Sequence, residues 1–375
     1  MRSISDTIRR LRTPLAMPQG SVAKRADRLT DLPEFGTNPG MLRARIYTPA
    51  NLADNAPLVV VLHGCTQSAA GYDQGSGWSA LADLHGFAAL FPEQQRANNA
   101  NLCFNWFVPE DTRRDSGEAL SIRQMVEAMV VAHGIDRSRI FVTGLSAGGA
   151  MASVMLATYP DVFAGGAIIA GLPYGGAATI PEAFDRMRGH GGPSDQALQT
   201  LLRGASSHDG PWPTISVWHG TADLTVNFSN ADRIVAQWRG VHRLPEKPSH
   251  IEASSTHGLQ VWRDTKGRAL IEVHSIAGMG HGTPIDANAV EGGSAAGPFM
   301  LDVGISSTLE IARLWGIAPM AQADEAQARP AARIGIPNDR IRVAAVPRPP
   351  RQAYASAKGV GKVIEDALRA AGLMK

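Results

Sequence analysis

The pentapeptide Gly144-Leu145-Ser146-Ala147-Gly148 places a serine between two glycines, after an apolar run and before a helical pattern. In a strand–turn–helix context, such a serine occupies a tight turn and projects its hydroxyl above the edge of a sheet. The glycines leave room where the turn brings backbones together, and the helix N-terminus directs its dipoles at a developing oxyanion. We predict that Ser146 is a nucleophile; the alternative is a serine that merely caps the helix.

A general base must accept the proton of this serine, because a serine hydroxyl alone is a weak nucleophile. With a turn of this kind the chain order is Ser, then Asp or Glu, then His. His281 lies between Gly280 and Gly282, in a loop that follows the last apolar run. His274 falls within that run and is expected to pack or to face solvent. We predict His281 as the base; the alternative is an exposed loop histidine.

The acid that orients the imidazole is expected at the end of a strand between these two residues. Asp223 follows the apolar run 214–218 after a short loop that contains His219 and Gly220. A carboxylate there would select the tautomer of His281 and stabilise the imidazolium. The alternative for Asp223 is that it caps the following turn. Three other aspartates lie in helix or insertion patterns and are weaker candidates: Asp161, Asp185 and Asp232.

Two backbone amides are needed to bind the oxyanion of a tetrahedral intermediate. The amide of Ala147, directly after the nucleophile, is expected to be one of them. The other is expected in the loop after the first buried run, where Cys65 is the favoured donor and Gly64 the alternative. An ordinary glycine turn would show the same local sequence.

Cys65 and Cys103 both lie near the predicted carboxyl edge of the sheet. Two interpretations stay open: a disulfide that ties two loops together, or two separate buried thiols. Trp106 and Phe107 follow Cys103 closely, and we predict that they form an apolar wall for substrate. For Trp106 the alternative is a place in the core.

Short apolar runs alternate with helical patterns through most of the chain. The run 41–48 alternates apolar and polar residues, and the runs expected to be buried strands are 57–62, 87–91, 139–143, 166–170, 214–218 and 270–276. The helical patterns are 76–85, 116–133, 147–159 and 231–240. This alternation predicts the α/β class: a mainly parallel sheet with helices on both faces and function at the carboxyl ends of the strands.

The chain is expected to divide around one catalytic domain. We predict a lead-in over residues 1–40 and an α/β domain over residues 41–320. Residues 171–212 are too long for a simple connection and are expected to form an insertion over the site. Residues 321–350, rich in Ala, Arg and Pro, resemble a flexible linker, and residues 351–375 regain the stripe of an amphipathic helix.

The composition is that of an ordinary globular protein. The chain has 375 residues, with 44% hydrophobic and 19% charged residues and a net charge of +2. This balance does not indicate a nucleic-acid partner, and no apolar run is long enough to span a bilayer. The N-terminus has no apolar core of a secretory signal and cysteines are few, so we expect a cytoplasmic protein.

The segments LHGCTQ, FPEQ, CFNWF, GLSAGGAM and GMGHG, in this order, resemble the poly(3-hydroxybutyrate) depolymerase family of esterases. That family is related to feruloyl and acetylxylan esterases, and the resemblance runs from about Met41 to Ala318. It implies an α/β-hydrolase fold and hydrolysis of carboxylic esters without metal or cofactor. It also implies the triad Ser146, Asp223 and His281, with Cys65 as an oxyanion donor.

Three features depart from secreted depolymerases: no secretory signal is visible, no polymer-binding domain is recognisable, and the tail over residues 321–375 is basic. We therefore expect a serine esterase for 3-hydroxyalkanoate esters or oligomers, rather than a polymer depolymerase. One alternative is a feruloyl- or acetylxylan-type carbohydrate esterase. Another is a granule-surface protein on a hydrolase scaffold, whose C-terminal helix contacts the polymer.

Overall fold

The structure is a computed structural model that describes residues 26–320 apart from residues 290 and 292. The expected linker over residues 321–350 and the expected helix over residues 351–375 lie outside the described residues. So does most of the expected lead-in. Within that lead-in, β1 (Thr30–Asp31) pairs with the next strand and extends the sheet.

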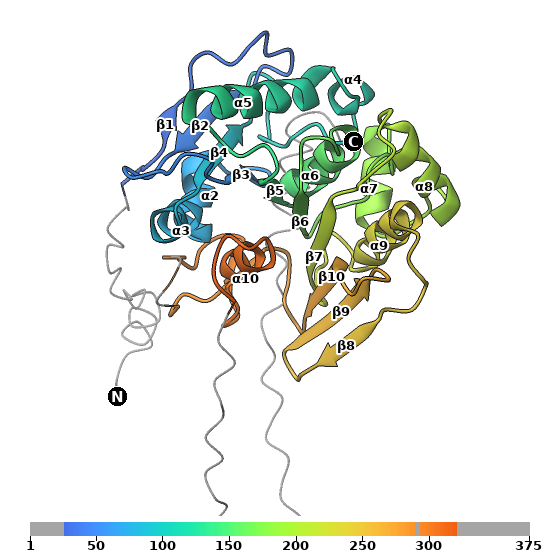
Figure 1. The fold of residues 1–375 in the computed structure, drawn as a ribbon. Coiled ribbons are helices and arrows are strands. Elements are labelled where there is room, and N and C mark those ends of the chain that lie inside the picture. The colour runs from blue at the N-terminus through green and yellow to red at the C-terminus, as the bar shows by residue number, and fades with distance from the viewer. Residues whose placement is uncertain (1–25, 290, 292, 321–375) are drawn as a thin grey trace, which may run out of the picture.

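A ten-stranded sheet dominates the fold, in the order β1-β2-β4-β3-β5-β6-β7-β10-β9-β8 (Figure 1). The pairs from β4 to β10 are parallel, and both edges are antiparallel. The strands after β1 are β2 (Arg43–Tyr47), β3 (Leu58–Leu62), β4 (Ala88–Glu93), β5 (Ile140–Leu145), β6 (Gly165–Ile169), β7 (Thr214–Gly220), β8 (His250–Ala253), β9 (His257–Arg263) and β10 (Ala269–Ile276). The predicted α/β class with a mainly parallel sheet is confirmed.

Helices cover both faces of this sheet because successive strand residues point to opposite sides. In β3, Leu58, Val60 and Leu62 enter one core and Val59 and Val61 enter the other. The first core lies under α5 (Gly117–His133), α6 (Ala147–Thr158) and α9 (Ser229–His242). The second lies under α2 (Ala69–Ser76), α3 (Trp78–His85) and α10 (Ser307–Leu314) (Figure 1).

The strand order changes direction at β3, because β4 lies on one side of it and β5 on the other. Ligand sites of open α/β sheets form at such points, outside the carboxyl ends of the strands. The register places Leu62, the last residue of β3, beside Gly144 near the end of β5. It also places Gly220, the last residue of β7, beside Ile276 of β10. The loops that carry Cys65, Ser146, Asp223 and His281 therefore leave the same edge of the sheet.

Between β6 and β7, the expected insertion contains two helices, α7 (Ile180–Met187) and α8 (Asp195–Gly204). Thr179 and Ser194 cap their N-termini, each accepting a backbone hydrogen bond in the first turn. The buried side chain of Gln237 on α9 donates to the carbonyls of Tyr174 and Leu198. The insertion is thus attached to the main domain through α9.

Some elements differ from the sequence-based expectations. The helix expected over residues 76–85 begins at Trp78 as α3, because Gly77 adopts a left-handed conformation (φ 80°) that separates α3 from α2. The hairpin of β8 and β9 and the helix α10 were not predicted. The structure also has α4 (Pro109–Thr112) and a two-stranded sheet of β11 (Thr283–Ile285) and β12 (Met300–Asp302).

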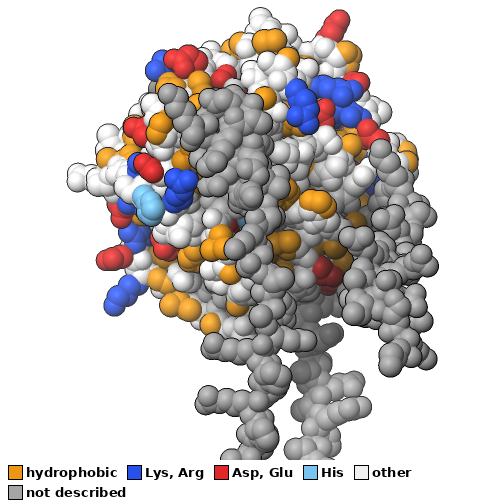
Figure 2. Space-filling view, turned by 180° about the vertical axis from the view of Figure 1, so that it is seen from behind, with side chains coloured by type: hydrophobic (Ala, Val, Ile, Leu, Met, Phe, Trp, Pro, Cys, Tyr) orange, Lys and Arg blue, Asp and Glu red, His pale blue; other side chains and the backbone are white. Residues whose placement is uncertain are grey.

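The surface mixes charges of both signs. On the face shown in Figure 2, acidic and basic side chains lie among scattered apolar ones where the described residues are visible. None of the helices in the described part of the chain has the length and hydropathy needed to cross a membrane.

Candidate active site

The turn at Ser146 joins β5 to α6 in a strained conformation, with φ 58° and ψ −117°. Positive φ is uncommon for a residue with a side chain, and such strain concentrates at functional sites. A Cβ atom on Gly144 would lie 2.4 Å from the carbonyl oxygen of Gly148. One on Gly148 would lie 2.3 Å from the carbonyl oxygen of Leu62. Both glycines of the pentapeptide are therefore needed for the turn to pack against β3.

The structure brings Ser146, His281 and Asp223 together, although they lie far apart in the chain. Nε2 of His281 lies 2.9 Å from Oγ of Ser146, and Nδ1 lies 2.7 Å from Oδ2 of Asp223. The carboxylate can only accept, so Nδ1 carries a proton and Nε2 is left to accept the serine proton. The Asp223 side chain is fully buried and that of His281 is 6% exposed. This hydrogen-bonded chain is the arrangement used by Ser-His-Asp hydrolases.

Asp223 is held in its charged form by its neighbours. Burial alone would raise the pKa of Asp223, but hydrogen bonds from His219, His281 and the Val226 amide hold it well below its usual value. Oδ1 also accepts the amide of Thr225 at 2.8 Å. His219 is fully buried, with Nε2 3.4 Å from Oδ2 of Asp223 and 2.8 Å from the Val226 carbonyl oxygen. Through these contacts His219 stabilises the loop that carries Asp223.

Two of the competing titratable residues, Asp161 and His274, have partners elsewhere. Asp161 forms an ion pair with Arg114 at 2.6 Å. His274 is buried in its strand and stacks on Trp218, with ring centroids 3.7 Å apart. Neither residue forms a hydrogen bond with Ser146.

In the loop after β3, the amides on either side of Cys65 are committed to other acceptors. The Gly64 amide donates to Oε1 of Gln67 at 2.8 Å, and the Thr66 amide donates to the Asn101 carbonyl at 2.7 Å. The Cys65 amide donates to none of the other described residues. Of the two donors that the sequence left open, the structure therefore favours Cys65 over Gly64. Ala147 begins α6, where an amide has no partner within the helix.

Cys65 and Cys103 form a disulfide. Of the two interpretations that the sequence allowed, the structure has the bond. It joins the loop after β3 to the loop after β4, which also contributes Asn101 as the acceptor for Thr66. Both cysteines line the same pocket as Ser146.

This pocket has a volume of about 620 Å³ and opens over Ser146 and Ala147. Its apolar wall includes Trp106 and Phe107, which pack edge to face with ring centroids 5.2 Å apart. Trp106 is only 8% exposed and also belongs to a small apolar cluster, so both interpretations of this residue apply. The rest of the apolar wall comes mainly from the insertion and the Asp223 loop: Leu172, Ile180, Ala183, Phe184, Met187 and Val226.

Sequence analysis missed the face of α7 that enters this pocket. Its residues follow the spacing i, i+3, i+4 and i+7 of a helical stripe, at Ile180, Ala183, Phe184 and Met187. That periodicity is visible in the sequence, but it does not tell whether the stripe faces a core or a ligand.

Part of the pocket lining is polar and was also missed. It carries the side chains of Asn98, Asn99, Asn101 and Asn105, all from the loop after β4. Asn99 donates to Oδ1 of Asn105 at 2.9 Å and accepts the amides of Asn101 and Cys103. The signal in the sequence is the cluster of asparagines itself. Of these four side chains, that of Asn101 makes no hydrogen bond to the other described residues, so it is left for an ester carbonyl or hydroxyl.

Glu118 on α5 accepts hydrogen bonds from residues of this polar part of the pocket. Its fully buried carboxyl group accepts from Gln94 Nε2 at 2.6 Å, Asn98 Nδ2 at 3.2 Å and the Asn105 amide at 2.9 Å. Burial and the nearby Asp111 carboxylate raise the pKa of Glu118 to about 8, even though these donors favour the charged form.

Among residues 26–320 apart from 290 and 292, no three His, Cys, Asp or Glu side chains are grouped as ligands for a metal ion. The polar groups over Ser146 are asparagine amides and backbone amides, which suit a neutral or oxyanionic ligand.

The sequence model of the esterase PHB depolymerase family matches residues 42–253. The chain belongs to this family. A curated family relative, poly(3-hydroxyalkanoate) depolymerase C of Paucimonas lemoignei, is 46% identical over 291 residues, covering 77% of this chain and 70% of the relative. The protein is accordingly a carboxylic ester hydrolase of the serine type.

Esterases of other substrates are also similar to this PHB depolymerase family member. Acetylxylan esterase A of Aspergillus oryzae is 32% identical over 278 residues, covering 71% of this chain and 87% of the relative. Among solved structures, an acetyl xylan esterase from Aspergillus awamori matches with a TM-score of 0.66 and 25% identity. The match covers 77% of this chain and 99% of that structure. The α/β-hydrolase fold is therefore shared across the family.

Substitution of Gly148 by alanine tests the nucleophile turn of this family member. The added Cβ would lie 2.3 Å and 2.5 Å from the carbonyl oxygens of Leu62 and His63, and backbone must move to relieve the clash. We expect Gly148→Ala to lose about 1–3 kcal/mol of unfolding free energy, and to lose ester hydrolysis. Gly204→Ala at the end of α8 is the control, since no atom lies within 4 Å of the new Cβ. Wild-type stability and turnover in Gly148→Ala would contradict this account of the turn.

Substitution of Glu118 by glutamine tests the buried carboxyl group through pH. The folded pKa of about 8 lies above the unfolded value, so the folded protein binds more protons between these values. The contribution of Glu118 to stability is therefore full at low pH and is lost as pH rises towards 8, by at most about 1.4 kcal/mol per pH unit. Urea unfolding at pH 5 to 8 gives the unfolding free energy of each protein. The value for wild type minus the value for Glu118→Gln should fall with this slope as pH rises.

Glu127, on the same helix, is the matched control for this measurement. Hydrogen bonds from Arg137 and Arg123, outweighing partial burial, lower the pKa of Glu127 to about 2. Glu127 is charged in both the folded and the unfolded state between pH 5 and 8. The difference in unfolding free energy between wild type and Glu127→Gln should therefore not change with pH in this range. A flat difference for Glu118→Gln as well would show that its carboxyl group ionises at its ordinary pKa.

Proposed function

We propose that this serine esterase hydrolyses 3-hydroxyalkanoate esters or oligomers, with Ser146 as nucleophile, His281 as base and Asp223 as its orienting acid. The observation that carries the catalytic assignment is the hydrogen-bonded chain from Oγ of Ser146 through His281 to Asp223. Each residue has the type and order along the chain that the mechanism requires.

In the first step Oγ of Ser146 attacks the ester carbonyl carbon while Nε2 of His281 takes the hydroxyl proton. The carbonyl oxygen becomes an oxyanion, which the amides of Cys65 and Ala147 bind. The intermediate collapses, the carbon–oxygen bond to the alcohol breaks, and the alcohol leaves with the proton from His281. Asp223 stays ionised throughout and stabilises the imidazolium.

In the second step water takes the place of the alcohol. His281 removes a proton from the water as its oxygen attacks the acyl-enzyme carbonyl. The same two amides bind the second oxyanion, and collapse returns the proton to Oγ of Ser146. The products are a carboxylic acid and the free enzyme.

The pocket supports an uncharged substrate with alternating apolar and polar groups. Its lining combines Trp106, Phe107 and the apolar stripe of α7 with asparagine side chains. A 3-hydroxyalkanoate oligomer has side chains for the apolar part and ester carbonyls for the polar part. The volume of about 620 Å³ leaves room for more than one such unit. The 46% identity to a relative named as a poly(3-hydroxyalkanoate) depolymerase supports the same class.

A carbohydrate esterase is the second candidate. The observation in its favour is the match to an acetyl xylan esterase structure over 99% of that chain, with a TM-score of 0.66. Both candidates use the same serine chemistry and differ only in the groups that the pocket accepts. The proposed polymer-surface contact of residues 351–375 lies outside the described residues.

Substitution of Ser146 by alanine should abolish hydrolysis of short p-nitrophenyl esters, lowering kcat by at least about 10⁴-fold, because the attacking oxygen is removed. Ser153→Ala is the matched control: Ser153 is a buried serine on the same helix, hydrogen bonded to the Gly149 carbonyl. Thermal unfolding of both variants checks the fold. Turnover near the wild-type rate in a folded Ser146→Ala protein would refute the assignment.

A side-by-side substrate panel separates the two candidate functions. We expect kcat/KM to be higher for 3-hydroxybutyrate oligomers than for feruloyl sugars or acetylated xylan, and to rise from dimer to trimer as more of the pocket is filled. Acid release measured by pH-stat gives the rates on one scale for all substrates. Higher kcat/KM on acetylated xylan than on any oligomer would favour the carbohydrate esterase.

A further inference from the structure

The peptide bond between Gly64 and Cys65 decides where the Cys65 amide points. In a planar trans peptide the carbonyl of one residue and the amide of the next point in opposite directions. Any contact that holds the Gly64 carbonyl therefore also aims the Cys65 amide. An oxyanion hole depends on such aim, because its donors act only if they are in place before charge develops.

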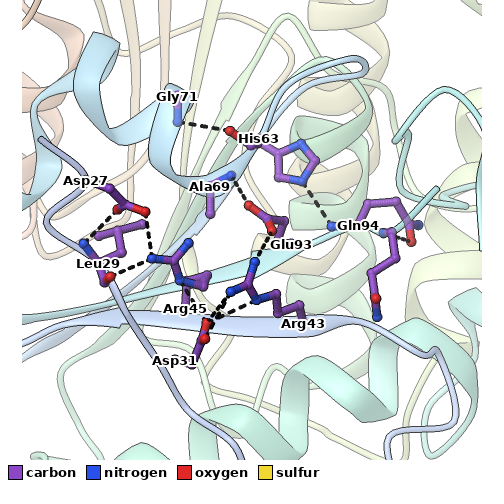
Figure 3. Close-up of polar contacts among 12 residues, drawn as sticks. Asp27, Leu29, Asp31, Arg43, Arg45, His63, Ala69, Gly71, Glu93 and Gln94 are labelled. Atoms are coloured by element: carbon purple, nitrogen blue, oxygen red, sulfur yellow. Dashed lines mark hydrogen bonds and ion pairs between the residues drawn. The ribbon is translucent and has the colours of Figure 1, made fainter. Parts of the chain in front are cut away.

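His63 holds this carbonyl. Its Nδ1 lies 2.8 Å from the Gly64 carbonyl oxygen. Its Nε2 accepts the Gln94 amide at 3.1 Å (Figure 3). Because Nε2 accepts, the ring proton is on Nδ1, which donates to the carbonyl. The ring is 1% exposed and packs on Phe104 with centroids 5.0 Å apart. Burial lowers the pKa of His63, which favours the neutral ring that both bonds require.

The end of β4 anchors both sides of the loop that follows β3. Gln94 holds the ring of His63 at the start of this loop. Its neighbour Glu93 accepts the Ala69 amide at 2.7 Å, at the start of α2 where the loop ends, and pairs with Arg43 at 3.4 Å (Figure 3). The segment FPEQ, to which the catalytic steps assign no role, thus has a place in the site.

We propose that His63 is a positioning residue of the oxyanion hole, which links the amide of Gln94 to the carbonyl of Gly64 and so aims the Cys65 amide at the substrate. The inference rests on the proposed function, because it assumes that this amide binds the oxyanion. A buried histidine that only fills space would make the same van der Waals contacts, but it would not need both hydrogen bonds.

Loss of the bond to Gly64 should act on the transition state rather than on substrate binding. The oxyanion forms only as the reaction proceeds, so a misdirected Cys65 amide lowers kcat while KM changes little. Removing one oxyanion donor outright lowers kcat by about 10²–10³-fold. Since His63 only aims the donor, we expect a loss of about tenfold to a hundredfold.

The experiment compares two variants of nearly the same shape. His63→Asn keeps an amide donor close to the position of Nδ1, whereas His63→Leu has no donor. We expect kcat on a p-nitrophenyl ester to be at least about tenfold lower in His63→Leu than in His63→Asn, with KM within about twofold. Affinity for a trifluoromethyl ketone, whose adduct places an oxyanion in the same site, should fall by the same factor as kcat.

His242→Leu and His242→Asn form the control pair. His242 is a half-buried histidine, with Nε2 3.0 Å from the Pro213 carbonyl oxygen at the far end of α9, and it has no part in the site. Both variants should keep the wild-type kcat, whatever their thermal stability.

Equal kcat in folded His63→Asn and His63→Leu would overturn the proposal, as would a matching difference between the two His242 variants. If His63→Leu does not fold, His63→Ala takes its place: kcat at least about tenfold lower in His63→Ala than in His63→Asn supports the proposal, and equal kcat contradicts it. Retained turnover in Ser146→Ala would instead refute the proposed function, so the two failures are distinguishable.

Discussion

The imidazole of His281, hydrogen bonded at 2.9 Å to Ser146 and at 2.7 Å to Asp223, is the contact on which the arrangement of the site depends. Three loops must leave the sheet at one edge for this contact to form. Parallel pairing of β5, β6, β7 and β10 meets that requirement, because parallel strands end on the same side. The antiparallel strands at the two edges of the sheet carry none of these three side chains.

The same edge of the sheet also carries the loops that form the pocket around Ser146. A disulfide joins the loop with the predicted oxyanion donor to the asparagine-bearing wall of the pocket. The insertion adds the apolar face of α7. The buried carboxyl group of Glu118 accepts a hydrogen bond from the Asn105 amide and so fixes the polar part of the pocket. We therefore expect substrate selectivity to depend on the parts that surround Ser146, His281 and Asp223, because function resides in the site rather than in the fold.

Prediction from sequence worked best where local pattern and burial agree. The apolar runs of β3, β4, β5, β6 and β7 were predicted because strands buried on both faces are apolar throughout. The hairpin of β8 and β9 was missed because β8 is exposed along its length and carries no apolar signal. The helix expected over residues 76–85 begins two residues late because Gly77 ends α2 first.

The sequence by itself determined the chemistry: the serine between glycines, the order of acid and base, and the buried strands that carry them. Only the tertiary structure decided which amide after β3 is uncommitted, whether the two cysteines bond, and which side of α7 meets the pocket. The physical reason is that turn and burial signals are local, recorded within a few residues. A contact such as that of His63 with Gln94 depends on the pairing of separate strands, which no short stretch of sequence contains.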